Sequence, residues 1–167
     1  MAETHLRQYS VQEKLNKMHV DLIISTPDIA EATYSDGDLM AEMEYITDAV
    51  AVKGGSCILQ SITAIDTSDT GGAIRVIITN NLADLGTVGS AVNAADAAAD
   101  NSMAIVDLTN WVDIGGAKVC TKGNLGIVMS SHSTSKDLRY GVVNVSGGDI
   151  VIGSGEDIIF NFGVVKD

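Results

Sequence analysis

The stretch 64-AIDTSDTGGAIRVIITNN-81 decides the fold, because it joins two apolar runs through a short segment of acids, hydroxyl residues and a glycine pair. In the second run Ile74, Val76 and Ile78 share one face, and strict alternation of this kind predicts a β-strand with one face on a core. The first run, 56-SCILQSITAID-66, is apolar on both faces, which is typical of a central strand covered on each side. We therefore predict two strands joined by a hairpin turn at the glycine pair.

The same two-residue rhythm recurs along most of the chain after residue 19. The clearest apolar row, formed by Ile158, Phe160, Phe162 and Val164, is expected to face the core. Glycine pairs separate these runs, and a single proline leaves almost every residue with the N–H group that a sheet needs. The predicted strands cover residues 20–24, 45–52, 56–66, 74–79, 103–108, 111–120, 125–129, 138–145, 149–152 and 158–164.

One segment departs from the strand pattern. Residues 90–101, SAVNAADAAADN, are rich in alanine and bounded by Ser90 and Asn101, which predicts a short helix covering an edge or one end of the sheets. Short strands with frequent turns and one inserted helix predict an all-β fold, an antiparallel β-sandwich. Jelly-roll topology is the favoured version, because it packs two four-stranded sheets together and limits their exposed edges.

The N-terminal segment, residues 1–19, differs in character from the predicted sandwich domain, residues 20–167. The motif 10-SVQE-13 has capping-box spacing and begins a predicted short helix with one thin apolar stripe. Three basic residues against two acids give this segment a charge of +1. Because the whole chain has a net charge of −12, residues 20–167 carry −13. Because such a helix is not stable alone, it either folds back on its own domain or acts as an arm that docks on a neighbouring subunit. The expected partner-binding residues of this arm are Val11, Lys14, Leu15, Lys17 and Met18.

The composition argues against several classes of function. A chain of 167 residues with 46% hydrophobic and 19% charged residues is expected to form a globular body with one core. A net charge of −12 argues against binding to nucleic acid or to an anionic membrane surface. No apolar run approaches the roughly 18 residues of a spanning helix, and the N-terminus lacks the apolar core of a secretion signal. Cys57 and Cys120 lie inside apolar runs and are expected to be buried and free, and no zinc site is supported.

The acidic turn in the opening stretch has some of the spacing of a calcium loop. A loop of the EF-hand type starting at Asp66 would need a glutamate at its twelfth position, where Ile77 stands. Asp66 and Asp69 are therefore expected to bond backbone N–H groups within the turn. The acid pairs Asp36/Asp38 and Glu156/Asp157 have the residue types of a hydrolase dyad, but they fall at turns and strand starts, where solvated caps are common, so neither a catalytic nor a metal residue is assigned.

His132 lies among several serines in 130-SSHSTSK-136 and suggests a hydrolase at first sight. A catalytic serine needs a base brought from elsewhere in the fold and oriented by a carboxylate, so a solvated loop is favoured. We assign no catalytic or cofactor-binding residue and expect neither an enzyme nor a cofactor. The sequence Asn144-Val145-Ser146 matches the acceptor pattern for N-glycosylation, but without a secretion signal we do not predict a glycan there. For a glycan-binding role, Trp111, Tyr34 and Tyr140 are the available stacking platforms, although burial of an aromatic ring is the more common outcome.

The order of these pieces resembles a group of small structural proteins of tailed bacteriophage virions. The motifs are the turn Tyr-x-x-Gly-Asp at Tyr34–Asp38, the Gly-Gly turn leading to 59-LQSI-62, the acidic turn that follows, and the segment 112-VDIGGAKVCTKGNLGIVM-129. The resemblance covers about residues 30–165 and leaves out the N-terminal segment. It implies a jelly-roll-like sandwich and a place in the virion, and it implies no catalytic residues.

The function expected from this resemblance is that of a head decoration, or cement, protein on the outer surface of a phage capsid. Such a protein is made in the host cytoplasm, binds the major capsid protein or other virion proteins, and stabilises the shell by bridging subunits. A small homo-oligomer is expected, with a trimer favoured over a dimer. The alternatives are a tail, fibre or baseplate component with the same sandwich, and a glycan-binding receptor module.

Overall fold

The computed structural model describes residues 19–80, 84–93, 101–153 and 157–166, and all regular structure within them is β. Every strand pairing is antiparallel. The six-stranded sheet has the order β1 (His19–Ser25), β12 (Ile158–Lys166), β4 (Ser56–Asp66), β8 (Lys118–Lys122) and β7 (Val112–Asp113), with β9 (Ile127–Ser130) paired to the start of β4. The four-stranded sheet has the order β3 (Leu39–Ile46), β10 (Leu138–Asn144), β5 (Ile74–Thr79) and β6 (Ser102–Leu108). A small third sheet pairs β2 (Ala32–Tyr34) with β11 (Ile150–Ile152).

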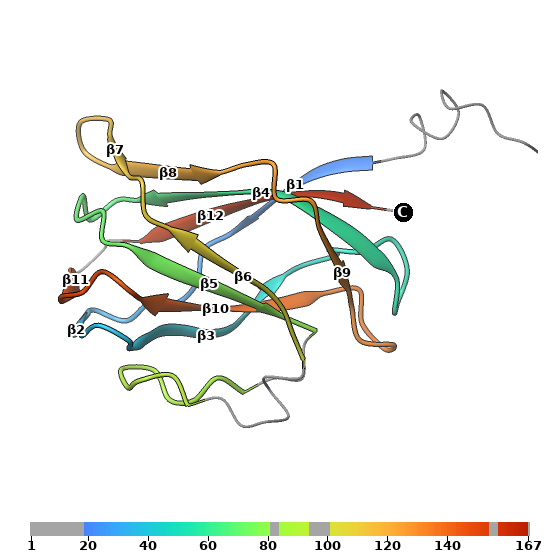
Figure 1. Cartoon of the computed structure of the whole chain (residues 1–167), viewed down its shortest axis with the longest axis horizontal. Helices are drawn as coiled ribbons and strands as arrows, with labels where there is room; N and C mark the ends of the chain where they lie inside the picture. The colour runs from blue at the N-terminus through green and yellow to red at the C-terminus, as the bar shows by residue number, and fades with distance from the viewer. Residues whose placement is uncertain (1–18, 81–83, 94–100, 154–156, 167) are drawn as a thin grey trace, which may run out of the picture.

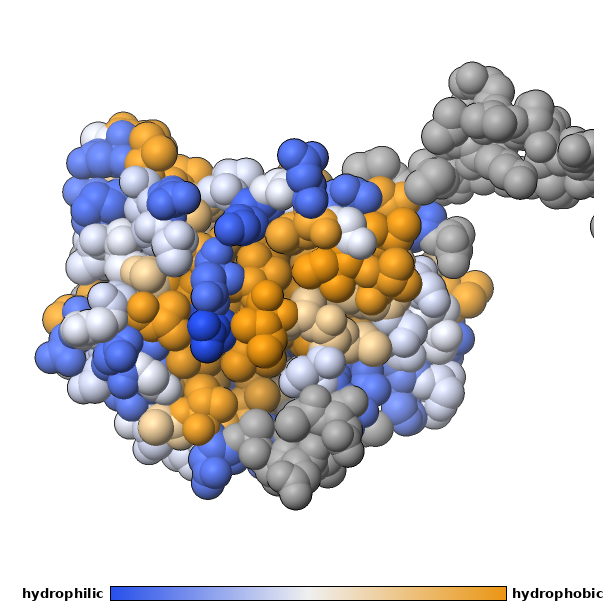
Figure 2. All heavy atoms as spheres, viewed as in Figure 1, coloured by the Kyte–Doolittle hydropathy of each residue, from blue (hydrophilic) through white to orange (hydrophobic). Residues whose placement is uncertain are grey.

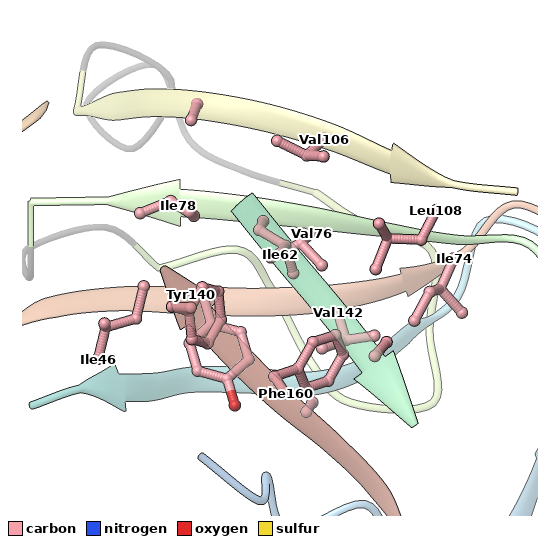
Figure 3. Packing of buried hydrophobic residues seen from close by; sticks show 14 of the residues in the cluster. Ile46, Ile62, Ile74, Val76, Ile78, Val106, Leu108, Tyr140, Val142 and Phe160 are labelled. Carbon is pink, nitrogen blue, oxygen red and sulfur yellow. The ribbon is translucent and has the colours of Figure 1, made fainter. Parts of the chain in front are cut away.

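The two large sheets lie face to face and enclose the main core (Figure 1). Tyr140 on β10 contacts Phe160 and Phe162 on β12, with ring centroids 5.5 and 5.0 Å apart. The hydroxyl of the buried Tyr140 donates a hydrogen bond to Ser25 Oγ on β1 at 2.8 Å, which satisfies its polar atom. Figure 3 shows Tyr140 and Phe160 beside aliphatic side chains from β4, β5 and β6. The expected inward row on β12 is confirmed, because its residues are buried in this cluster.

The acidic turn connects a strand of one large sheet to a strand of the other, and does not connect two neighbouring strands of the same sheet. β4 belongs to the six-stranded sheet and β5 to the four-stranded sheet, so the chain crosses the edge of the core between Asp66 and Ile74. The prediction of a turn was therefore right, and the prediction of a hairpin between these two strands was wrong. A turn motif fixes a change of direction, whereas the pairing of the strands depends on the rest of the sheet.

Most predicted strands are present, with three differences. The strand expected at residues 45–52 is misplaced: β3 runs over Leu39–Ile46, and it gives way after Ile46 to a turn that includes Asp48 with a φ of 50°. The segment expected as one strand at 111–120 is divided by its glycine pair into β7 and β8. The short strand β2 was not predicted, because three residues carry too little alternation to be recognised.

The helix predicted at residues 90–101 is not observed in the part of this segment that is described. Residues 90–93 contain an isolated β-bridge between Ala91 and Asp38 and hydrogen-bond to other backbone segments: Ser90 O accepts from Leu39 N at 2.9 Å, and Val92 N donates to Gly37 O at 3.2 Å. The carbonyl of Ser90, which a helix starting here would use for its first turn, is thus bonded to another segment. Residues 94–100 lie outside the described residues, as do residues 1–18, where the amphipathic arm was predicted; His19 already belongs to β1.

The loop at residues 84–93 covers part of the outer face of the four-stranded sheet. Leu85 is buried there in a second cluster with Leu39, Ile77 and Val143. Gly141 on β10 lies directly beneath, since a Cβ at this position would clash with the Leu85 side chain. The fold therefore covers one of its two outer surfaces with its own loop.

Candidate interaction surface

The outer face of the six-stranded sheet is defined by the pleat of its strands. On β12, Phe160 and Phe162 point into the core, so the residues between and beside them point outward. Side chains directly opposite on neighbouring strands share a face. The residues on the outer face are Leu22, Ile24, Ile58, Ser61, Thr63, Ile65, Val112, Val119, Thr121, Val128, Ile159, Asn161, Gly163 and Val165. We call this set the outer A face.

The outer A face carries no charged residue. Its members are aliphatic, hydroxyl or amide side chains and one glycine. The chain as a whole has 10 basic and 22 acidic residues, and the water-facing side of a sheet in such a chain would normally carry polar and charged side chains. The Thr63 and Thr121 hydroxyls hydrogen-bond to each other at 2.9 Å across β4 and β8, so even the polar groups at this point are paired within the face.

Large aliphatic side chains on this face are open to solvent at both of its margins. Leu22 and Ile24, on the edge strand β1, are each 66% exposed. Val112 on β7 and Val128 on β9, on the opposite side, are 63% and 69% exposed. Large exposed apolar side chains gathered on one sheet face are a feature of protein contact sites.

The central strand β4 has one face in the core and the other on the outer A face. The sequence predicted a central strand covered on both sides, and β4 is indeed central, between β12 and β8/β9. Its inward residues Leu59 and Ile62 are in the core, whereas Ile58 and Ile65 lie on the outer A face. β4 thus carries large apolar side chains on both faces, and among the described residues only one of these faces is covered by a second layer.

The outer face of the four-stranded sheet is different, because it is charged and partly covered. Arg75 on β5 donates to Asp107 on β6 through Nε (2.7 Å) and a terminal nitrogen (3.0 Å), and this pairing lowers the pKa of Asp107. On β3, burial and a hydrogen bond to Asp84 raise the pKa of Glu42. The pKa of Asp84 is lowered, mainly by the hydrogen bond from the backbone N–H of Gly86 and secondly by the hydrogen bond with Glu42.

A pocket of about 310 Å³ opens between this face and the loop at 84–93. It is lined by Gly37, Arg75, Ile77, Ala91, Val92, Val143 and Val145. Arg75 is the only charged residue in the lining, and its guanidinium is already engaged by Asp107. The pocket is therefore a weak candidate for an anionic ligand.

The acids singled out in the sequence serve the turns. Asp66 is buried and accepts hydrogen bonds from Ser68 N at 2.9 Å, Gly71 N at 2.8 Å and Thr70 Oγ1 at 3.1 Å, as expected. Asp69 lies beside Lys118, with its carboxylate 4.0 Å from Nζ, and does not share this role. Asp36 and Asp38 accept from Gly147 N and Ser35 N. Within the described ranges, no group of three or more His, Cys, Asp or Glu residues is placed to hold a metal ion.

The remaining sequence candidates are not brought together into one site. His132 Nδ1 lies 2.9 Å from Thr134 Oγ1 within its own loop. Of the aromatic platforms, Tyr34 and Tyr140 are fully buried and Trp111 packs against the main core, so the two tyrosines cannot stack on a sugar. Asn144 is also buried, and its side chain donates to Tyr34 O and Gly148 O. Both cysteines are buried and neither forms a disulfide, as predicted.

The arm residues Val11, Lys14, Leu15, Lys17 and Met18 lie outside the described residues. In the described part of the chain, no helix is long and apolar enough to cross a bilayer. Comparison with family models, with curated proteins and with solved structures finds no match to this chain.

Sequence reasoning missed the outer A face because alternation along residues 20–24 predicts a strand without saying which of its two sides meets the core. Leu22 and Ile24 alternate like core residues, yet Ile23 is the residue that packs against the core. The available signal was the presence of large apolar side chains on both faces of β4, combined with the absence of charged residues from the outward row of β12.

Proposed function

We propose that this chain is a structural protein of a phage virion, a head decoration protein that binds the outside of the capsid and stabilises the shell by bridging subunits. The observation that carries the proposal is the outer A face, a charge-free and largely aliphatic sheet surface on a strongly acidic chain. A surface of this composition suits contact with protein and offers no group for chemistry on a small substrate.

The strand order gives a second line of support. We leave out the short strands β2, β7 and β11 and count β8 and β9, which both pair with β4, as one position. The strand orders are then β1-β12-β4-β8/β9 and β3-β10-β5-β6, which is two sheets of four positions each. This arrangement supports a jelly-roll classification, the version that the sequence favoured. The fold alone does not determine function, so the virion role rests on the resemblance of residues 30–165 together with the surface.

The decisive experiment is co-sedimentation of the purified full chain with purified capsid shells. We expect saturable binding, with a copy number that matches the symmetry of the major capsid protein; a tail component would instead be present in few copies per particle. Deletion of residues 1–18, which leaves β1 intact, is expected to abolish binding if the arm makes the contact. Failure of the full chain to bind shells would refute the decoration role, whereas unchanged binding of the deletion variant would refute only the role of the arm.

A further inference from the structure

We propose that the outer A face is the surface through which two copies of this chain associate, face to face, about a two-fold axis. The inference rests on the composition and exposure of this face and does not depend on the virion role. Its occupant is a second copy of the same chain, for the electrostatic reason that follows.

Two acidic copies repel each other, so the place where they touch must carry as little charge as the surface allows. In a two-fold contact the same patch meets itself, and any charged residue in the patch would face like charges from its copy. The outer A face meets this requirement, because none of its residues is charged in a chain of net charge −12. A basic partner would instead be met by the acidic residues that the chain carries elsewhere.

The position of the exposed side chains suits such a contact. Leu22 and Ile24 form one margin of the face and Val128 the other, and all three are about two-thirds exposed. Rotation by half a turn about an axis that lies in the interface and runs parallel to the strands brings the β1 margin of one copy over the β9 margin of the other. Aliphatic side chains from both margins then bury one another and extend the sandwich by a further layer.

The size of the face sets the expected strength. Five neighbouring strand positions about 4.8 Å apart and about six residues of about 3.4 Å each give a footprint of roughly 400–500 Å². A standard stable interface buries about 800 Å² per partner, so the face supplies about half of one. We therefore expect reversible association with a dissociation constant in the micromolar range.

Other exposed hydrophobic residues provide the matched controls. Figure 2 shows hydrophobic residues gathered over β6 and β9, where the edges of the two large sheets approach each other. Ile105 on β6 is 60% exposed and belongs to the four-stranded sheet. Val151 on β11 is 53% exposed and belongs to the small third sheet. Each can receive the same substitution as a residue of the outer A face without altering that face.

The experiment is sedimentation velocity on the full chain, from about 1 µM to about 100 µM. We expect the wild type to pass from monomer to dimer, and Ile24→Glu to raise the dissociation constant by at least about tenfold. Val128→Glu, on the opposite margin, is expected to act in the same way and gives a second, independent variant. Because these side chains are mostly exposed, both variants are expected to keep the wild-type far-ultraviolet circular dichroism spectrum.

Ile105→Glu and Val151→Glu are expected to dimerise like the wild type. The proposal is overturned if the wild type stays monomeric over the whole range, if its mass is that of a trimer, or if Ile105→Glu abolishes association and Ile24→Glu does not. Binding to capsid shells, measured separately, reports on the decoration role. A wild-type chain that stays monomeric over the whole range but still binds shells would therefore refute this inference and leave the proposed function standing.

Discussion

At the scale of single residues, Asp66 holds the crossing between the two sheets. Its carboxylate accepts from two backbone N–H groups and from the hydroxyl of Thr70, and it is 2% exposed. Removing an acceptor at a buried position leaves its donors without partners, which costs more than the net value of the bonds.

We expect Asp66→Ala to lower the free energy of unfolding by about 2–4 kcal/mol, because the N–H groups of Ser68 and Gly71 lose a charged acceptor. Urea unfolding followed by circular dichroism measures the change. Asp69→Asn is the control: Asp69 has a φ of 60°, which asparagine tolerates, and we expect a change within about 0.5 kcal/mol. Equal losses for the two variants would show that the turn does not depend on the Asp66 carboxylate.

Glu42 and Asp84 make the stability of the fold depend on pH. The pKa of Glu42 is raised, so its stabilising contribution is present below its unfolded pKa and is lost as pH rises through the higher folded pKa. The pKa of Asp84 is lowered, and its contribution has the opposite sign. Glutamine at position 42 resembles the protonated acid at every pH.

We therefore expect Glu42→Gln to raise the melting temperature at about pH 7 and to have little effect at about pH 4. Thermal unfolding across this range provides the measurement. Glu44→Gln removes the same charge from the same strand, β3, and controls for the change in net charge. An identical rise for Glu44→Gln would assign the effect to net charge and not to the pair.

At the scale of elements, the loop at residues 84–93 acts as a cover for one sheet. Leu85 packs on Leu39, Ile77 and Val143, above the space left by Gly141. Asn93 N donates to Leu85 O at 3.1 Å and closes the loop on itself. Strands β5 and β10 thus have an apolar covering on the outside that is supplied by their own chain.

We expect Leu85→Ala to lower the free energy of unfolding by about 2–4 kcal/mol, as deletion of a buried leucine side chain does elsewhere. Hydrogen exchange followed by mass spectrometry is expected to show faster exchange in residues 84–93 than in β12. Val88→Ala, at a residue of the same loop that is 39% exposed, is the control with a small expected loss. Uniform acceleration across all strands would mean that the loop has no separate stability.

At the scale of the whole molecule, net charge and the outer A face act against each other. Each copy carries −12, so electrostatic repulsion weakens any contact between copies while apolar burial favours it. Salt screens the first effect and does little to the second at moderate concentration. The response to salt therefore identifies the type of partner.

We expect self-association to strengthen by about threefold to tenfold when NaCl is raised from about 0.05 M to about 0.5 M. Sedimentation velocity at the two salt concentrations measures this. Association that weakens with salt would indicate contacts between opposite charges and would contradict pairing through an uncharged face. The Val151→Glu variant, which adds one charge away from the face, is expected to show the same trend.

The sequence by itself determined the all-β class, most of the strands, the inward row of β12 and the hydrogen bonds of Asp66. These features depend on alternation and on short-range bonding, which are local properties of the chain. The tertiary structure alone decided which side of β1 meets the core, the crossing from β4 to β5 between sheets, and the path of residues 90–93. Alternation gives a strand two faces but does not say which one a second layer will cover. Where both faces carry large apolar side chains, as on β4, only the packing of distant segments chooses the buried one, and the face left over is the outer A face.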